Sequence, residues 1–114
     1  MSGATIFSRI LAGEFPAKRL HEDDDCIVIA DIAPQAPLHA LVIPKKPIAS
    51  LAAATAADAA LLGRLLLVAQ SVAVKAGHGA AFRVVANSGA GAGQSVMHLH
   101  FHVLAGRPMN WPPG

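Results

Sequence analysis

The sequence contains little cysteine and few charged residues, and its first residues do not resemble a signal peptide. Cys26 is the only cysteine, so the chain has no disulfide framework and suits a reducing compartment, which we expect to be the cytoplasm. Charged residues make up 14% of the chain and hydrophobic residues 54%, a balance that excludes intrinsic disorder. No charged segment followed by an apolar run opens the chain, and we therefore expect no signal peptide.

A basic stripe and a long uninterrupted apolar run are also missing. Lysines and arginines are scattered and the net charge is only +2, so we expect no nucleic-acid partner. The longest apolar region, residues 52–76, contains Asp58, Arg64, Gln70 and Lys75. These interruptions favour a buried or amphipathic helix over a membrane span, and we expect no membrane partner.

The 114 residues fit one domain, which we assign to residues 1–114. Helical spacing of apolar side chains predicts helices over residues 5–11 and 56–75. β-branched and alternating stretches predict strands over residues 18–20, 26–30, 38–43, 81–86 and 97–104. The acidic group at residues 22–25 could hold a cation, but its place between two strands favours a solvated hairpin turn.

The stretch over residues 97–104 alternates three histidines with apolar residues. Strict alternation predicts a half-buried strand whose side chains point to opposite faces in turn. His98, His100 and His102 would then share one face, while the apolar residues between them anchor the other. Three imidazoles on one rigid support can transfer protons, attack an electrophile or bind a metal.

A glycine-rich loop precedes these histidines. Gly89, Gly91 and Gly93 alternate with alanines, and Gln94 and Ser95 follow with amide and hydroxyl donors. Glycine lets the backbone approach a ligand closely and point its N–H groups at one anion. The loop is not a P-loop, because no Gly-Lys-Ser/Thr follows. Next to the histidines it indicates a phosphate ligand, with the loop binding oxygens and a histidine attacking phosphorus.

Zinc binding is an alternative use of the three histidines. On a straight strand the Cα atoms of the outer two would be roughly 13 Å apart, which strains their convergence on one ion. The cysteine pairs typical of structural zinc sites are missing. We therefore expect no metal and no cofactor, with a catalytic three-histidine zinc site as the alternative.

The segment His-Leu-His-Phe-His-Val-Leu at residues 98–104 resembles the motif of the histidine-triad (HIT) family. Gly-Gln-Ser-Val at residues 93–96 and Trp-Pro-Pro-Gly at residues 111–114 are similar to its Hint branch, the histidine-triad nucleotide-binding proteins. The resemblance extends over nearly the whole chain. It implies an α+β HIT fold, in which a five-stranded antiparallel sheet and two helices form each subunit. It also implies a homodimer whose sheets join into one of ten strands.

The resemblance further implies an enzyme that acts on nucleotides. The implied activity is that of a purine nucleoside phosphoramidase, which hydrolyses the P–N bond between AMP or GMP and an amine through a nucleotidyl-histidine intermediate. By position, His100 would attack the α-phosphorus, His98 and His39 would support its orientation, and His102 would contact phosphate oxygens. Ser95 belongs to the same catalytic group.

The residues that bind the substrate follow from the same resemblance. Ser95 and the backbone N–H groups of Gly93 and Val96, beside Gln94, would hold the phosphate or the leaving-group nitrogen. Asp31 would accept hydrogen bonds from the ribose hydroxyls.

Other contacts of the substrate are implied in the same way. Asn87 would contact the phosphate or the ribose, and Trp111 would reach toward the partner subunit's site on the leaving-group side. The residues that would wall the base pocket are apolar: Ile6, Phe7, Ile10, Ile29 and Ile32.

Two other functions are compatible with this sequence. One is a nucleotide-binding interaction or regulatory protein whose hydrolysis is incidental. The other is a dinucleoside polyphosphate hydrolase. A His100→Ala variant that still binds AMP and still supports the cellular role would favour the first of these.

Overall fold

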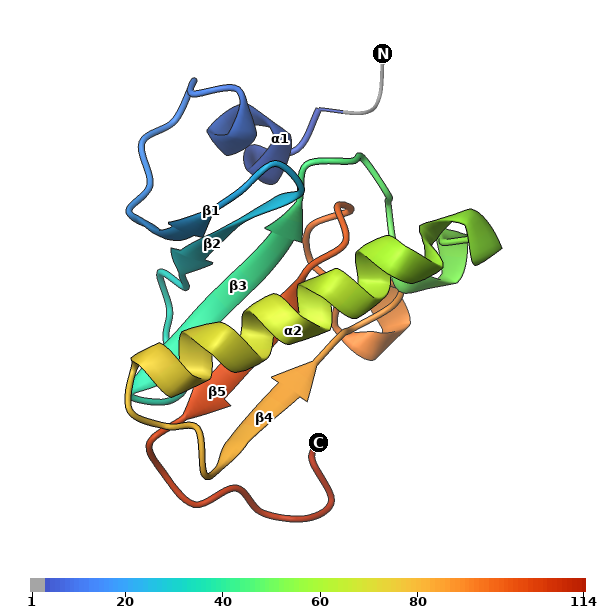
Figure 1. Ribbon diagram of the computed structural model, residues 1–114. Helices are drawn as coiled ribbons and strands as arrows, with labels where there is room; N and C mark the ends of the chain where they lie inside the picture. The colour runs from blue at the N-terminus through green and yellow to red at the C-terminus, as the bar shows by residue number, and fades with distance from the viewer. Residues whose placement is uncertain (1–3) are drawn as a thin grey trace.

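A five-stranded antiparallel sheet occupies the centre of the computed structural model, which describes residues 4–114 (Figure 1). The strands in chain order are β1 (Arg19–Glu22), β2 (Cys26–Ala30), β3 (Leu38–Pro44), β4 (Phe82–Val85) and β5 (Phe101–Ala105). Their order in the sheet is β1-β2-β3-β5-β4, so β1 and β4 are its edges. The α+β class and the five antiparallel strands are confirmed.

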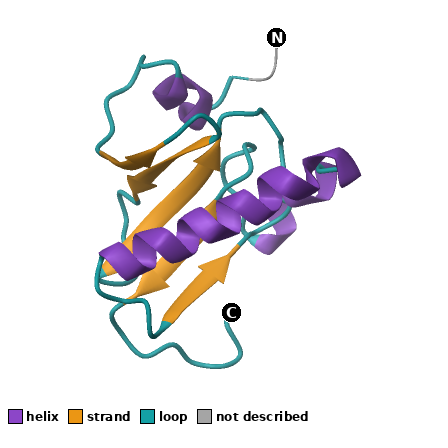
Figure 2. Ribbon diagram, viewed as in Figure 1, coloured by secondary structure: helices purple, strands orange, loops and turns teal. Residues whose placement is uncertain are grey.

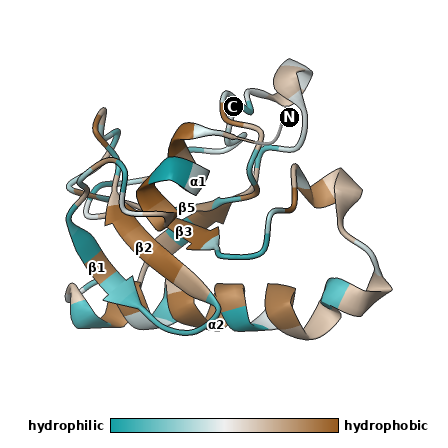
Figure 3. Cartoon of the chain, turned by 90° about the horizontal axis from the view of Figure 1, so that it is seen from above, coloured by the Kyte–Doolittle hydropathy of each residue, from teal (hydrophilic) through white to brown (hydrophobic). Residues whose placement is uncertain are grey.

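Two helices cover opposite faces of the sheet, as the views in Figures 2 and 3 show. The short α1 (Ile6–Leu11) begins after Thr5, whose side chain accepts the backbone N–H of Ser8 in a capping box. The long α2 (Ala59–Lys75) follows a 3₁₀ turn over Ala56–Asp58. Both predicted helices are therefore present, although the first turn of the second is 3₁₀ rather than α.

Each face of the sheet has its own apolar core. Cys26 and Val28 of β2 pack with α2, whereas Ile27 and Ile29 pack with the residues of α1. Successive residues of a strand point to opposite faces, so one uninterrupted apolar strand feeds both cores. This is why β2 and the second half of β3 are continuously apolar, as strands covered on both faces are.

The helix over residues 56–75 is, by length and composition, long and apolar enough to cross a membrane, and it is the one such helix within residues 4–114. Its inner side packs against the sheet through Leu65, Val68 and Val72, as in a core helix of a globular protein. Its outer side is also apolar: Leu67 is 67% exposed and Val74 is 55% exposed.

The strand predicted over residues 97–104 is wrong in its first half. β5 begins at Phe101, and residues 97–100 are irregular. The ladder between β3 and β5 reaches only the pair of Val42 and Phe101. Beyond it, the backbone N–H of Leu99 donates to the carbonyl of Ile48, outside the ladder. Only His102 of the three histidines therefore lies within β5. The predicted alternation of faces still holds, since Leu99, Phe101 and Val103 pack in the core beneath α2. The rings of His98 and His100 lie beside Phe7 on the α1 side.

Other differences are small and lie at the ends of elements. Pro44, expected to stop β3, is its last residue and pairs with Cys26. The acidic group forms the predicted turn, since β1 ends at Glu22 and β2 begins at Cys26. The predicted strands over residues 18–20 and 81–86 are shifted or shortened, because edge strands have ladder partners on one side only.

Leu65 is fully buried between α2 and the sheet, so its truncation should be costly. We expect Leu65→Ala to lower the free energy of unfolding by about 2–5 kcal/mol, through lost burial and the cavity left behind. Leu20→Ala, on an exposed position of β1, is the control and should change it by less than about 0.5 kcal/mol. Urea unfolding measures both, and equal effects would contradict this account of the core.

Candidate active site

A pocket of about 260 Å³ opens between α1, the end of β2 and the segment before β5. His100, His102 and Ser95 line it together with Asp31. Its remaining lining residues are mostly apolar: Ile6, Phe7, Ile10, Ile29, Ala30, Ile32, Leu41 and Val96. A larger groove of about 1300 Å³ runs along α2, but none of the triad histidines lines it.

Two hydrogen bonds fix the position and tautomer of His100. Its Nδ1 lies 2.8 Å from the carbonyl oxygen of His98, and a carbonyl can only accept, so Nδ1 carries the proton and donates. The Nε2 atom of neutral His100 then has a free lone pair, as a nucleophile requires. The ring of His98 is held in the same way, since its Nε2–H donates to the carbonyl of Pro44 over 2.7 Å.

A second chain of hydrogen bonds orients His102. The backbone N–H of Gln35 donates to Nδ1 of His39 over 3.0 Å, so the proton of neutral His39 is on Nε2. That Nε2 lies 2.8 Å from Nδ1 of His102 and 3.3 Å from a carboxylate oxygen of Asp31. His102 then accepts at Nδ1 and keeps its Nε2–H as a donor. Asp31 thus contacts both the pocket and His39.

Phe7 packs edge-on against His100, with ring centroids 4.9 Å apart, and the rings of His100 and His102 are 5.0 Å apart. Burial lowers the pKa of His98, and the hydrogen bond to the carbonyl of Pro44 raises it by a smaller amount. Burial also lowers the pKa of His102, and the neighbouring His100 lowers it further. Both rings are therefore neutral near pH 7, in agreement with the tautomers above.

The glycine loop is held in shape by two glycines and one glutamine. Gly89 and Gly93 have φ of +91° and +95°, which other residues adopt only with strain, and they flank a 3₁₀ turn over Ala90–Ala92. The side-chain oxygen of Gln94 accepts the N–H of Gly89, and its amide donates to the carbonyls of Ala49 and Val96.

These bonds reassign two predicted donors. Gln94 is buried with its side-chain amide engaged, so it shapes the loop and does not reach the pocket. The N–H of Gly93 donates to the carbonyl of Ala90 and is not free for a phosphate. Within residues 4–114, the backbone N–H groups of Ser95 and Val96 donate to no other residue. These two N–H groups, with the Ser95 hydroxyl, are the available anion donors.

Three predicted contacts lie at or outside the margin of the pocket. Trp111 is 84% exposed and does not line it. Ile32 lines its rim but is fully exposed. The side-chain amide of Asn87 lies near Gly93 and does not line the pocket. Two backbone groups also belong to the site, the N–H of Gln35 and the carbonyl of Pro44, and no side-chain pattern in the sequence reveals them.

The three rings of the triad do not gather their nitrogens as a metal site would. Among the described residues, the group with closely spaced ligand atoms at the pocket is Asp31, His39 and His102, within 4.8 Å of one another. Those atoms already bond to each other. The arrangement supports proton transfer and attack on an electrophile by one free imidazole nitrogen, His100 Nε2.

The antiparallel sheet, the two helices and the histidine-lined pocket with its available backbone N–H groups define a small α+β protein with a histidine-rich candidate active site. The HIT domain family model matches residues 12–109, and the chain belongs to the HIT family. It is 55% identical to an uncharacterized HIT-like protein of Synechocystis sp. and 52% identical to one of Synechococcus elongatus, and each match covers all of both chains.

Solved structures agree with this assignment. The crystal structure of a HIT family hydrolase from Legionella pneumophila is 42% identical, with a TM-score of 0.95 over 97% of this chain and 100% of that one. A HIT family hydrolase from Clostridium thermocellum is 36% identical, with a TM-score of 0.91 over 96% of each chain. The fold is that of a HIT family hydrolase.

The lowered pKa values of His98 and His102 predict how stability depends on pH. The unfolded chain binds protons at these rings below about pH 6.5, whereas the folded chain resists protonation. The contribution of these two rings to stability should therefore be constant above about pH 7 and fall as the pH drops below about 6.5. His98→Gln, which can still donate to the carbonyl of Pro44, should reduce this slope. Denaturant unfolding across pH measures it, and an unchanged slope would contradict the assignment.

Proposed function

We propose that this protein is a purine nucleoside phosphoramidase of the Hint branch, which cleaves the P–N bond between AMP or GMP and an amine. The observation that carries the proposal is the free Nε2 of His100 beside the pocket, with its other nitrogen fixed to the carbonyl of His98. A neutral imidazole held in this tautomer is a competent nucleophile toward phosphorus.

The reaction proceeds in two displacements at the same phosphorus. His100 Nε2 attacks the α-phosphorus, and the P–N bond breaks as the amine nitrogen takes a proton from the His102 side of the pocket. Water then attacks phosphorus, breaks the bond to Nε2 and returns a proton to that side, releasing the nucleoside monophosphate. The N–H groups of Ser95 and Val96 stabilise the negative charge on the equatorial oxygens.

The shape and polarity of the pocket support a nucleoside monophosphate as its occupant. Ile6, Phe7 and Ile10 form an apolar wall that suits a purine ring, while Asp31 offers a carboxylate to ribose hydroxyls. Because Asp31 also contacts Nε2 of His39, ribose binding and the orientation of His102 are physically linked. His39 is therefore a positioning residue in this scheme.

His100→Ala should abolish the proposed activity. We expect its kcat/KM for an adenosine 5′-phosphoramidate to fall by at least about a thousandfold, because the nucleophile is lost. His78→Ala, which removes a histidine outside the pocket, is the control and should retain activity. Release of the amine in the presence of EDTA is the measurement. Retained turnover in His100→Ala would refute the role of His100.

The same assay separates the alternative substrate class. A dinucleoside polyphosphate hydrolase would cleave diadenosine triphosphate or tetraphosphate faster than the phosphoramidate. We expect a P–N preference here, as the resemblance to the Hint branch implies. A higher kcat/KM for the dinucleotide would replace the phosphoramidase proposal and leave the role of His100 intact.

We also propose that two copies of this chain associate through β4 and the outer side of α2. β4 is a sheet edge with unpaired backbone groups, and β5 is its neighbour on the other side. The adjoining groove is lined by apolar residues of α2, including Leu66 and Leu67, and by Phe82 and Val84 of β4. Pairing of two β4 edges would give the continuous ten-stranded sheet that the family resemblance implies.

A charge on the outer side of α2 should separate such a dimer. We expect Leu67→Asp to be monomeric by multi-angle light scattering at concentrations where the unaltered chain is dimeric, because it would bury an unpaired carboxylate. Leu20→Asp is the matched control: it places the same charge on an exposed position of β1, at the opposite edge, and should remain dimeric. A monomeric unaltered chain would refute the proposal.

A further inference from the structure

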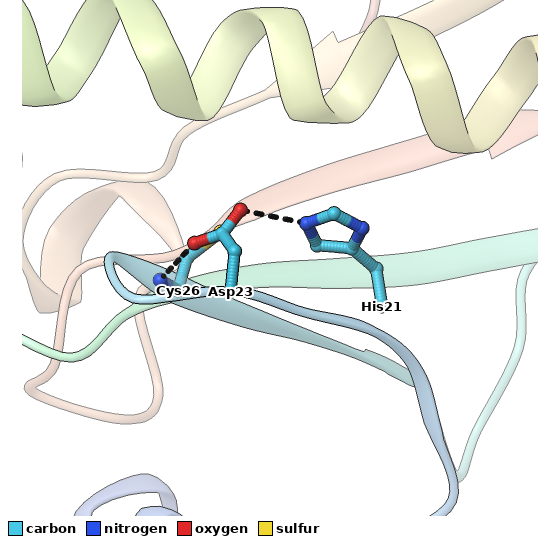
Figure 4. Close-up of side chains that lie close together, drawn as sticks. All are labelled: His21, Asp23 and Cys26. Carbon is cyan, nitrogen blue, oxygen red and sulfur yellow. Dashed lines mark hydrogen bonds and ion pairs between the residues drawn. The ribbon is translucent and has the colours of Figure 1, made fainter.

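We propose that His21, Asp23 and Cys26 bind a divalent transition-metal ion, best matched by zinc, at the closed end of the β1–β2 hairpin. Each offers a different ligand atom, and these atoms all lie within 4.8 Å of one another. Figure 4 shows the three side chains together on the side of the hairpin that faces α2. None of these residues lines the histidine-lined pocket; His21 and Asp23 instead line the groove along α2, on the same side of the sheet as the proposed contact between two copies.

An irregularity in the hairpin places His21 on this side. Arg19 pairs with Ile29, but His21 pairs with Val28, so the register shifts by one residue between them. With the unshifted register, His21 would pair with Ile27 and face the α1 core. The shift instead puts His21 on the face of Val28 and Cys26, which pack toward α2. β-bulges commonly re-aim one side chain in this way.

The carboxylate of Asp23 is held with one oxygen directed at the other two residues. Its Oδ1 accepts the backbone N–H groups of Asp25 and Cys26, over 2.8 and 2.9 Å, which closes the turn. Its Oδ2 is not needed for the turn. That oxygen lies 2.7 Å from Nε2 of His21 and 3.7 Å from Sγ of Cys26.

These separations are close to those of a tetrahedral site. Zinc bonds of about 2.0–2.3 Å to nitrogen, oxygen and sulfur hold the donor atoms about 3.3–3.7 Å apart. The Sγ–Oδ2 distance already fits, and Nε2 of His21 has to withdraw from Oδ2 by less than about 1 Å. Side-chain exposures of 24% for His21 and 31% for Asp23 leave a route from solvent to the enclosed sulfur.

The donor set also balances the charge of the ion. On binding, Cys26 loses its thiol proton to solvent, and His21 carries its remaining proton on Nδ1 so that Nε2 can coordinate. One thiolate and one carboxylate then neutralise a dication, with water in the fourth position. A mixed sulfur, nitrogen and oxygen set favours zinc over magnesium or calcium, which prefer oxygen alone.

The single cysteine makes a direct test possible, because a thiolate-to-metal band can come only from Cys26. Cobalt(II) titrated into the metal-free full-length protein should give a saturable near-ultraviolet thiolate-to-cobalt band at one ion per chain. Zinc should remove the band by competition. At roughly a hundredfold excess of zinc over its Kd, Tm should rise by about 10 °C. Cobalt bound at the imidazoles of the other pocket gives no such band.

Two variants and one control complete the test. Cys26→Ala should lack the band, and His21→Gln should weaken cobalt affinity at least about tenfold, while His78→Gln should leave it unchanged. His21→Gln retains the buried thiol, so it remains informative if Cys26→Ala folds poorly. No band at millimolar cobalt, or the same affinity in His21→Gln, would overturn the proposal.

Discussion

The hydrogen bond from Nδ1 of His100 to the carbonyl of His98 is the constraint on which the rest of the site depends. It determines which nitrogen of His100 has a free lone pair, and so whether the ring can attack at all. The carbonyl of His98 is in turn held in place because the His98 ring donates to Pro44, the last residue of β3. The position of the nucleophile is thereby tied to the centre of the sheet.

The two faces of the sheet have different tasks in this arrangement. Leu41 and His102 pair across β3 and β5 and both line the pocket on the α1 side. On the other side, the continuous apolar packing beneath α2 supplies most of the core. Changes on the α2 side, including association with another chain, need not disturb the bonds among the histidines.

The sequence predicted the elements well, because each is marked by strong local signals. Helical spacing of apolar side chains marks the two helices, and short apolar stretches mark β2 and β3. It failed at residues 97–100, where alternation indicates a strand but the chain leaves the ladder. Alternation records which side chains are buried, and an irregular segment held by side-chain hydrogen bonds can bury the same residues.

The candidate site was predictable in its side chains and not in its backbone partners. The histidines, Asp31 and Ser95 are visible as residue types, whereas the N–H of Gln35 and the carbonyl of Pro44 are common to any residue. Gln94 shows the same limit: its amide is equally suited to a ligand or to the loop itself. Only the three-dimensional placement of Gly89 and Ala49 decides between them.

The shortness of α1 has a consequence for how ligands exchange. Six residues make too few internal hydrogen bonds to be helical alone, so α1 is held mainly by Phe7 and Ile10 against the sheet. The same two side chains form a wall of the pocket. Fraying of α1 would widen the pocket while the strands stay in place. A bound purine would oppose that fraying, so occupancy and local order at the N-terminal end rise and fall together.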